Sequence, residues 1–218
     1  MCVSIASCWY LAIYKNMTSP TPASDRVLKM ATRAGVIHAR EVRTAGISHE
    51  YLRRMLSAGQ LVRVGRGLYM PAVGNLSEHS SLVLCAKAVP KGVVCLISAL
   101  RFHGVGTQLP SETWVAIQRG DAVPRIHAPR LQVIRMSGLS FSSGQELHTV
   151  DGVRVKMYSV AKTVADCFKF RARVGLDVAL EALRESIRLK KSTRDDIWRH
   201  ANHCRVANII RPYLEALA

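Results

Sequence analysis

The sequence predicts an α+β fold with a small N-terminal part and a larger C-terminal part, and three observations support this prediction. Residues 24–58 carry short apolar repeats with helical spacing, and residues 61–70 carry two strand-like runs joined by glycines. Further on, strand-like runs alternate with glycines and prolines, and the pattern from Ser159 onward is helical. We therefore expect one domain at residues 24–78 and a larger α+β domain with a helical C-terminal part at residues 79–218.

Residues 1–23 are expected to be a flexible arm or a non-native start. The segment Val3–Tyr14 is apolar and has about the length of a signal-peptide core, but no Lys or Arg precedes it. Met17 is the better candidate for the natural start, and Thr18–Ser24 is rich in Ser, Thr and Pro, as loose arms are. Because the sequence has no uninterrupted apolar stretch of about 18 residues, no transmembrane helix is predicted.

The composition indicates a folded protein with a polyanionic partner. Hydrophobic residues make up 49% of the 218 residues, which is enough to bury a core. The chain has 31 Lys and Arg against 15 Asp and Glu, a formal net charge of +16. Such a surplus points to nucleic acid or to an anionic membrane surface, and the charge alone does not choose between them.

The six cysteines do not have the spacing of a disulfide framework. None of them forms a C-x-x-C pair, and Cys85, Cys95 and Cys167 lie among apolar residues, where buried free thiols occur. Free thiols fit a reducing compartment. We therefore expect a cytoplasmic protein.

Helical patterns account for most of the first domain. A half-buried helix is indicated by apolar residues with helical spacing at Val27, Met30, Ala31 and Ala34. A second, short helix is predicted at residues 38–45 and ends at Gly46. A third is predicted at residues 49–58, where Ser48 can cap its start and Gly59 can end it.

Two strands, Leu61–Val64 and Leu68–Met70, are expected to follow as a β-hairpin. Gly65 and Gly67 supply the backbone freedom that a tight hairpin tip needs, and Pro71 closes the unit. Three helices followed by a hairpin, with a glycine in the turn between the second and third helices, are typical of a winged helix-turn-helix.

The second domain is predicted from weaker patterns. Helices are expected at residues 80–89 and 98–103, followed by strands at residues 113–118, 131–136 and 153–158. In the helical C-terminal part, an apolar stripe with helical spacing is formed by Leu176, Leu180, Leu183 and Ile187. These patterns predict an α+β domain with a helical end.

The third helix of the first domain separates apolar from polar side chains. Its packing face carries Leu52, Met55 and Leu56, and its opposite face carries Glu50, Arg53, Arg54 and Ser57. A helix with arginines on its outer face fits the major groove of DNA, where Arg bonds bidentately to guanine. We therefore expect Arg53 and Arg54 to contact bases.

Basic residues elsewhere in the first domain strengthen this interpretation, since residues 24–78 contain nine Lys and Arg against four Asp and Glu. Arg63 and Arg66 flank the hairpin and are expected to hold phosphates, as is the N-terminus of the third helix. The predicted DNA-binding residues are Arg40, Arg43, Ser48, His49, Glu50, Arg53, Arg54, Ser57, Arg63 and Arg66.

Other classes of function fit the residues less well. A nuclease would need clustered carboxylates, and the spacing of the candidates Asp151, Lys156 and Asp166 matches no known motif. His200 and Cys204 have the i, i+4 spacing of a metal-ligand pair on a helix, but a site would need further ligands. The apolar start and the basic body would suit attachment to an anionic membrane surface. Such attachment would not require a helix-turn-helix followed by a wing. We therefore expect no enzyme activity, no metal and no cofactor.

Nucleotide-binding loops and single-strand binding are also disfavoured. The Gly-x-Gly pairs at residues 65–67 and 104–106 lack the rest of any nucleotide fingerprint, and turns explain both. A base-stacking platform would need clustered aromatic residues, whereas the tryptophans are dispersed at Trp9, Trp114 and Trp198. Duplex DNA is the favoured partner.

Several runs of the sequence share a pattern with a known family. The most specific is Arg63-Val-Gly-Arg-Gly-Leu-Tyr69, within the longer run from Gly46 to Pro71. The second domain adds Ser98-Ala-Leu-Arg-Phe-His-Gly104 and Tyr158-Ser-Val-Ala-Lys-Thr-Val-Ala-Asp-Cys-Phe168. Together these runs resemble the AbiEi-type antitoxins of AbiE abortive-infection toxin–antitoxin systems.

The resemblance implies a bacterial antitoxin that represses its own promoter by binding inverted repeats and counters a nucleotidyltransferase-like toxin. Its recognition helix would be His49–Ala58 and its wing Leu61–Met70. Neutralisation in this family need not involve a stable complex, so the toxin is expected as a functional partner. The second domain, with 21 Lys and Arg against 11 Asp and Glu, suits further contact with DNA, RNA or an acidic partner. A stand-alone winged-helix transcription regulator, whose C-terminal domain binds a ligand or protein partner, is the alternative.

Overall fold

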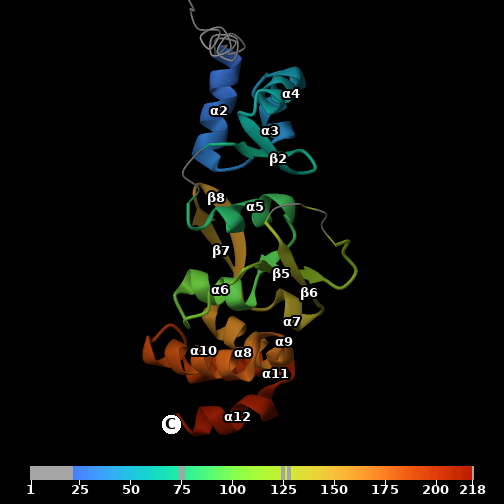
Figure 1. The fold of residues 1–218 in the computed structure, drawn as a ribbon. Coiled ribbons are helices and arrows are strands. Elements are labelled where there is room, and N and C mark those ends of the chain that lie inside the picture. Colours follow the sequence, from blue (N-terminus) through green and yellow to red (C-terminus); the bar gives the residue numbers. More distant parts are fainter. Residues whose placement is uncertain (1–21, 74–76, 124–125, 127–128, 218) are drawn as a thin grey trace, which may run out of the picture. The chain divides into compact units, whose positions relative to one another are not determined.

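The structure, a computed structural model, describes residues 22–73, 77–123, 126 and 129–217. Contacts divide the chain into two compact units, residues 1–63 with 67–75 and residues 64–66 with 76–218 (Figure 1). None of the helices in the described ranges is both long and apolar enough to cross a membrane. The fold class is α+β, as the sequence predicts.

The described part of the first unit begins with the helix α2 (Pro22–Ala34). Pro22 and Ala23 were expected at the end of the N-terminal arm, and this expectation is wrong because both belong to α2. Proline is tolerated in the first turn of a helix, where its missing N–H would have no partner within the helix. The rest of the predicted arm, residues 1–21, lies outside the described residues.

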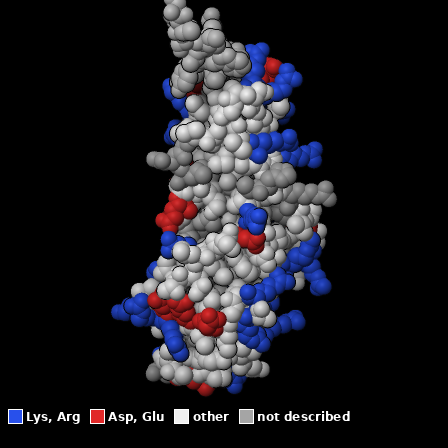
Figure 2. Space-filling model, viewed as in Figure 1, with Lys and Arg blue, Asp and Glu red and all other residues white. Residues whose placement is uncertain are grey.

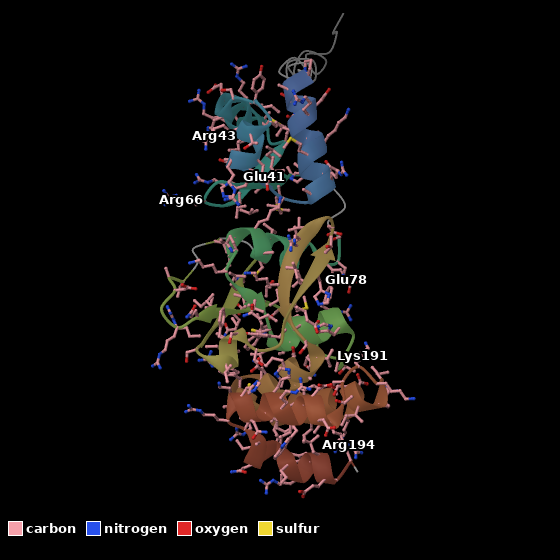
Figure 3. The ribbon with its side chains drawn as sticks, turned by 180° about the vertical axis from the view of Figure 1, so that it is seen from behind. Glu41, Arg43, Arg66, Glu78, Lys191 and Arg194 are labelled. Carbon is pink, nitrogen blue, oxygen red and sulfur yellow. The ribbon has the colours of Figure 1, made fainter. Side chains whose placement is uncertain are left out.

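The helix-turn-helix of the first unit consists of α3 (Ala39–Thr44) and α4 (His49–Ser57). His38 caps α3: its ring Nδ1 accepts a hydrogen bond from the backbone of Arg40 at 3.4 Å, and its own N–H donates to Glu41 Oε2 at 2.9 Å (Figure 3). The turn between the helices contains Gly46 at a φ of +74°. These contacts fix where both helices begin.

A three-stranded antiparallel sheet lies in the first unit, except for residues 64 and 65 at the end of its strand β2. It consists of β1 (Ile37–His38), β2 (Leu61–Gly65) and β3 (Leu68–Pro71) in the order β1-β3-β2. The sequence predicts the β2–β3 hairpin but not β1, because two residues are too short to show a period of two. The side chains that form the core of this unit are Val27, Ala31, Ile37, Val42, Ile47, Leu52, Met55, Leu61 and Tyr69.

The second unit is built on a five-stranded mixed sheet with the order β6-β5-β4-β8-β7. The strands β5 (Thr113–Gln118), β6 (Leu131–Met136) and β8 (Val153–Tyr158) have the predicted bounds. The strands β4 (Val93–Val94) and β7 (Gln145–Val150) were not predicted. β4 is too short, and β7 is an edge strand with mostly exposed polar side chains, so it lacks the apolar alternation of a half-buried strand.

Helices cover the sheet and form the C-terminal part of the second unit (Figure 1). In order they are α5 (Ser80–Ala88), α6 (Leu96–His103), α7 (Leu139–Ser142), α8 (Val160–Lys169), α9 (Arg171–Val174), α10 (Leu176–Arg188), α11 (Arg194–Cys204) and α12 (Ala207–Glu215). The helices α10 and α11 both pack on α8. α8 is therefore the central helix of this unit, and its residues from Val160 to Phe168 are all buried.

The central helix carries a buried ion pair. Lys162 and Asp166 are each 0% exposed, and Lys162 Nζ lies 2.5 Å from Asp166 Oδ2. The ammonium group is also 4.1 Å from the centre of the Tyr158 ring, and Cys204 Sγ donates to Asp166 Oδ1 at 3.2 Å. Burial raises the pKa of Asp166, and the charge of Lys162 opposes this rise. Inside the core, each of the two charges is therefore stabilised by the other.

Candidate nucleic-acid interface

The helix α4 presents an apolar face inward and two arginines outward. The hydroxyl of Ser48 accepts a hydrogen bond from a backbone N–H in the first turn at 3.3 Å and caps the helix. Leu52 and Met55 are 0% and 2% exposed and belong to the core of the first unit. The side chains of Arg53 and Arg54 are 74% and 67% exposed. The outer face of α4 is therefore accessible to a ligand.

Glu50 contacts both outward arginines. Its Oε1 lies 3.0 Å from Nη2 of Arg53 and 3.6 Å from Nε of Arg54, whose guanidinium also lies 5.7 Å from the centre of the Tyr51 ring. Exposed pairs at i, i+3 and i, i+4 contribute only about 0.3–0.5 kcal/mol, so they do not hold the arginines against a stronger partner. These pairs were not predicted from the sequence, although the i, i+3 and i, i+4 spacing of opposite charges is the pattern that indicates them.

The other predicted DNA-binding residues of the helices are also exposed. Arg40 and Arg43 lie on α3, and His49 and Ser57 are the first and last residues of α4. Figure 2 shows basic side chains at the surface over the region of α4 and the hairpin. These residues add positive charge and small polar groups beside the outward face of α4.

The hairpin contributes two further arginines. Arg63 is an exposed residue of β2, and Arg66 is exposed in the turn between β2 and β3. Figure 3 shows Arg66 extending outward from this turn. Gly67 follows at a φ of +71°, and a Cβ there would lie 3.1 Å from the ring of His38. Glycine is thus required both for the conformation of the tip and for its close approach to the cap of α3.

The helices and the hairpin of the first unit correspond to a known domain. Residues 25–72 match the family described as "Transcriptional regulator, AbiEi antitoxin". These residues form an AbiEi-type domain. The match confirms the resemblance for residues 25–72 and supports a role as a regulator or antitoxin.

The chain is also similar to a solved structure along most of its length. The crystal structure of the RV2827C protein from Mycobacterium tuberculosis matches with a TM-score of 0.54 and 14% sequence identity, covering 90% of this chain and 80% of that chain. At this identity the likeness concerns the fold alone. No curated protein matches the chain.

The residues considered for a nuclease site do not come together in one place. Asp166 is fully buried in α8 and paired with Lys162. Asp151 is exposed in the turn between β7 and β8, where it accepts a hydrogen bond from Ser77, and Lys156 is exposed on β8. The buried carboxylate and the exposed one cannot share a catalytic metal ion.

The histidines of α11 have polar partners within the protein. The Nδ1 atoms of His200 and His203 each lie 2.9 Å from the hydroxyl oxygen of Ser143, whereas Cys204 Sγ points to Asp166. Burial, together with the charge of Lys162, lowers the pKa of His200 to about 4. His200 is therefore neutral at pH 7 and helps to hold α11 against the end of α7, rather than forming the i, i+4 metal pair considered from the sequence.

The loop at residues 104–106 does not offer its backbone to a phosphate. The N–H of Gly106 donates to Glu185 Oε2 at 2.7 Å, and the N–H of Thr107 donates to Glu181 Oε1 at 3.0 Å. Carboxylates of α10 thus already occupy the N–H groups that a nucleotide would need. These contacts agree with the prediction that the Gly-x-Gly pair at residues 104–106 forms a turn and not a nucleotide-binding loop.

Proposed function

We propose that this protein is a DNA-binding transcriptional repressor that acts in the cytoplasm and controls its own promoter. The observation that carries the proposal is the exposure of Arg53 and Arg54 on the outer face of α4, the third helix of an AbiEi-type domain. The net charge of +16 supplies the attraction to a polyanion.

In the proposed complex, α4 enters the major groove of duplex DNA. Arg53 and Arg54 exchange their contacts with Glu50 for bidentate hydrogen bonds to guanine. Arg63 and Arg66 hold phosphates along the hairpin, and the N-terminus of α4 at Ser48 holds another. Two copies bound at inverted repeats would then block the promoter, because palindromic operators mirror the twofold symmetry of the bound protein.

The salt dependence of binding tests this mechanism and separates phosphate contacts from base contacts. Replacing Arg66 with alanine should weaken binding to the operator and to a scrambled duplex by the same factor. It should also lower the slope of log affinity against log salt concentration by about 1, because one phosphate contact is lost. Fluorescence anisotropy at several salt concentrations measures both quantities. A loss confined to the operator would show that Arg66 contacts bases instead.

We further propose that the protein is the antitoxin of a nucleotidyltransferase-like toxin, on the strength of the AbiEi family match. Expression of the neighbouring reading frame alone should arrest growth, and co-expression with this protein should restore it. A variant lacking residues 1–78 has no AbiEi-type domain. Its effect on growth therefore separates the antitoxin role from the role in repression. A neighbour that is harmless by itself would favour a stand-alone transcription regulator whose C-terminal domain binds a ligand or protein partner.

A further inference from the structure

Three side chains of the second unit converge from two elements that are far apart in the sequence. His103 is the last residue of α6, whereas Glu146 and His148 lie two residues apart on β7 and so share one face of that strand. The ligand atoms of the three residues all lie within 4.8 Å of one another. Nε2 of His148 and Oε2 of Glu146 are 3.0 Å apart. Two imidazoles and a carboxylate thus face one point.

A hydrogen bond to the backbone determines which ring nitrogen of His103 remains available to a metal ion. Its Nε2 lies 2.9 Å from the carbonyl oxygen of Tyr158. Because a carbonyl oxygen only accepts hydrogen bonds, Nε2 carries the proton, and in the neutral ring Nδ1 keeps a lone pair for a cation. Histidine ligands in proteins commonly donate their other N–H to a backbone carbonyl in this way.

Packing around the cluster restricts the rings and leaves space for an ion. The ring of Phe102 lies 5.1 Å from that of His148 and 5.6 Å from that of His103. The three residues line a cavity of about 640 Å³. Lys191, labelled in Figure 3, also lines it, but its ammonium donates to the carbonyl oxygens of His103 and Gly104. The ammonium group of Lys191 is therefore directed at the backbone that ends α6.

We propose that His103, Glu146 and His148 bind a divalent transition-metal ion of the zinc class, with solvent as the fourth ligand. Zinc binds imidazole nitrogen and carboxylate oxygen at about 2.0–2.2 Å in a tetrahedron, so its ligand atoms lie about 3.4 Å apart. Nε2 of His148 and Oε2 of Glu146 form a hydrogen bond of 3.0 Å, which the ion would replace with two bonds to the metal. The ion would connect the end of α6 to the edge strand β7 and keep one exchangeable position.

Zinc binding by the untagged full-length protein, freed of metal with a chelator, tests the proposal. Titration calorimetry and competition with a chromophoric chelator should show one zinc ion per chain, and zinc should raise the thermal unfolding midpoint. His148→Ala should weaken binding at least tenfold, on the order of the loss seen when metal sites are perturbed. The matched control His203→Ala removes a histidine of the same unit outside the cluster and should leave the affinity unchanged.

The milder variant Glu146→Gln guards against loss of folding, because residue 146 is exposed and the amide has nearly the same size. It should keep the circular-dichroism spectrum of the wild type and bind zinc more weakly. A wild-type protein whose calorimetric trace and unfolding midpoint do not respond to zinc would overturn the proposal. Equal affinities in the wild type, His148→Ala and Glu146→Gln would also overturn it, since the ion would then lie elsewhere.

Discussion

Replacing Asp166 with alanine is expected to lower the free energy of unfolding of the second unit by about 3–5 kcal/mol. The substitution leaves the ammonium of Lys162 in the core, 0% exposed, without the carboxylate that lies 2.5 Å from it. The ring of Tyr158 compensates only a part of that charge. Urea unfolding followed by circular dichroism measures the change, and failure to recover folded protein would agree with a loss at the upper end of this range.

A matched pair of controls separates the buried charge from the loss of side-chain volume. The double variant Lys162→Met with Asp166→Leu removes both charges and keeps apolar volume, so it should recover most of the stability. Asp196→Ala removes a carboxylate of α11 that pairs with Arg199 at the surface, and it should cost far less than Asp166→Ala because solvent screens this exposed pair. A loss below about 1 kcal/mol for Asp166→Ala would show that Lys162 becomes neutral at little cost.

The sequence predicts the longer strands whose side chains are largely apolar and partly or fully buried. β5, β6 and β8 have their predicted bounds. β1, β4 and β7 were missed for physical reasons: the first two have two residues each, and the third lies at an edge with polar side chains on both faces. Tertiary hydrogen bonds, not a local pattern, define such strands.

The difference between local sequence patterns and tertiary contacts also explains which functional sites can be predicted from the sequence. The outward face of α4 follows from helical spacing alone, because Leu52 and Met55 are buried and Arg53 and Arg54 are exposed. The His103 cluster is not visible in this way. Two of its residues lie on β7, a strand that the sequence pattern does not predict. The third, His103, is more than forty residues away in the sequence and comes close to them only in the folded protein.

Removal of both outward arginines of α4 is expected to abolish specific binding to DNA. The double variant Arg53→Ala with Arg54→Ala should lose about 2–6 kcal/mol of binding free energy on the operator, since each bidentate contact to guanine contributes about 1–3 kcal/mol. The loss on a scrambled duplex should be smaller, because only the attraction to phosphates is reduced there. Anisotropy titrations with a duplex that the protein itself selects from a random pool measure both losses.

A charge-matched control decides whether position or charge causes the loss. Lys29→Ala with Arg33→Ala also removes two positive charges from the first unit, but from exposed positions of α2. This control should weaken binding to the operator and to the scrambled duplex by equal, smaller factors. If the α4 variant behaves in the same way, Arg53 and Arg54 contact only phosphates. In the expected case, Glu50→Gln should strengthen binding to both duplexes, because Glu50 competes with DNA for the two arginines and repels phosphate.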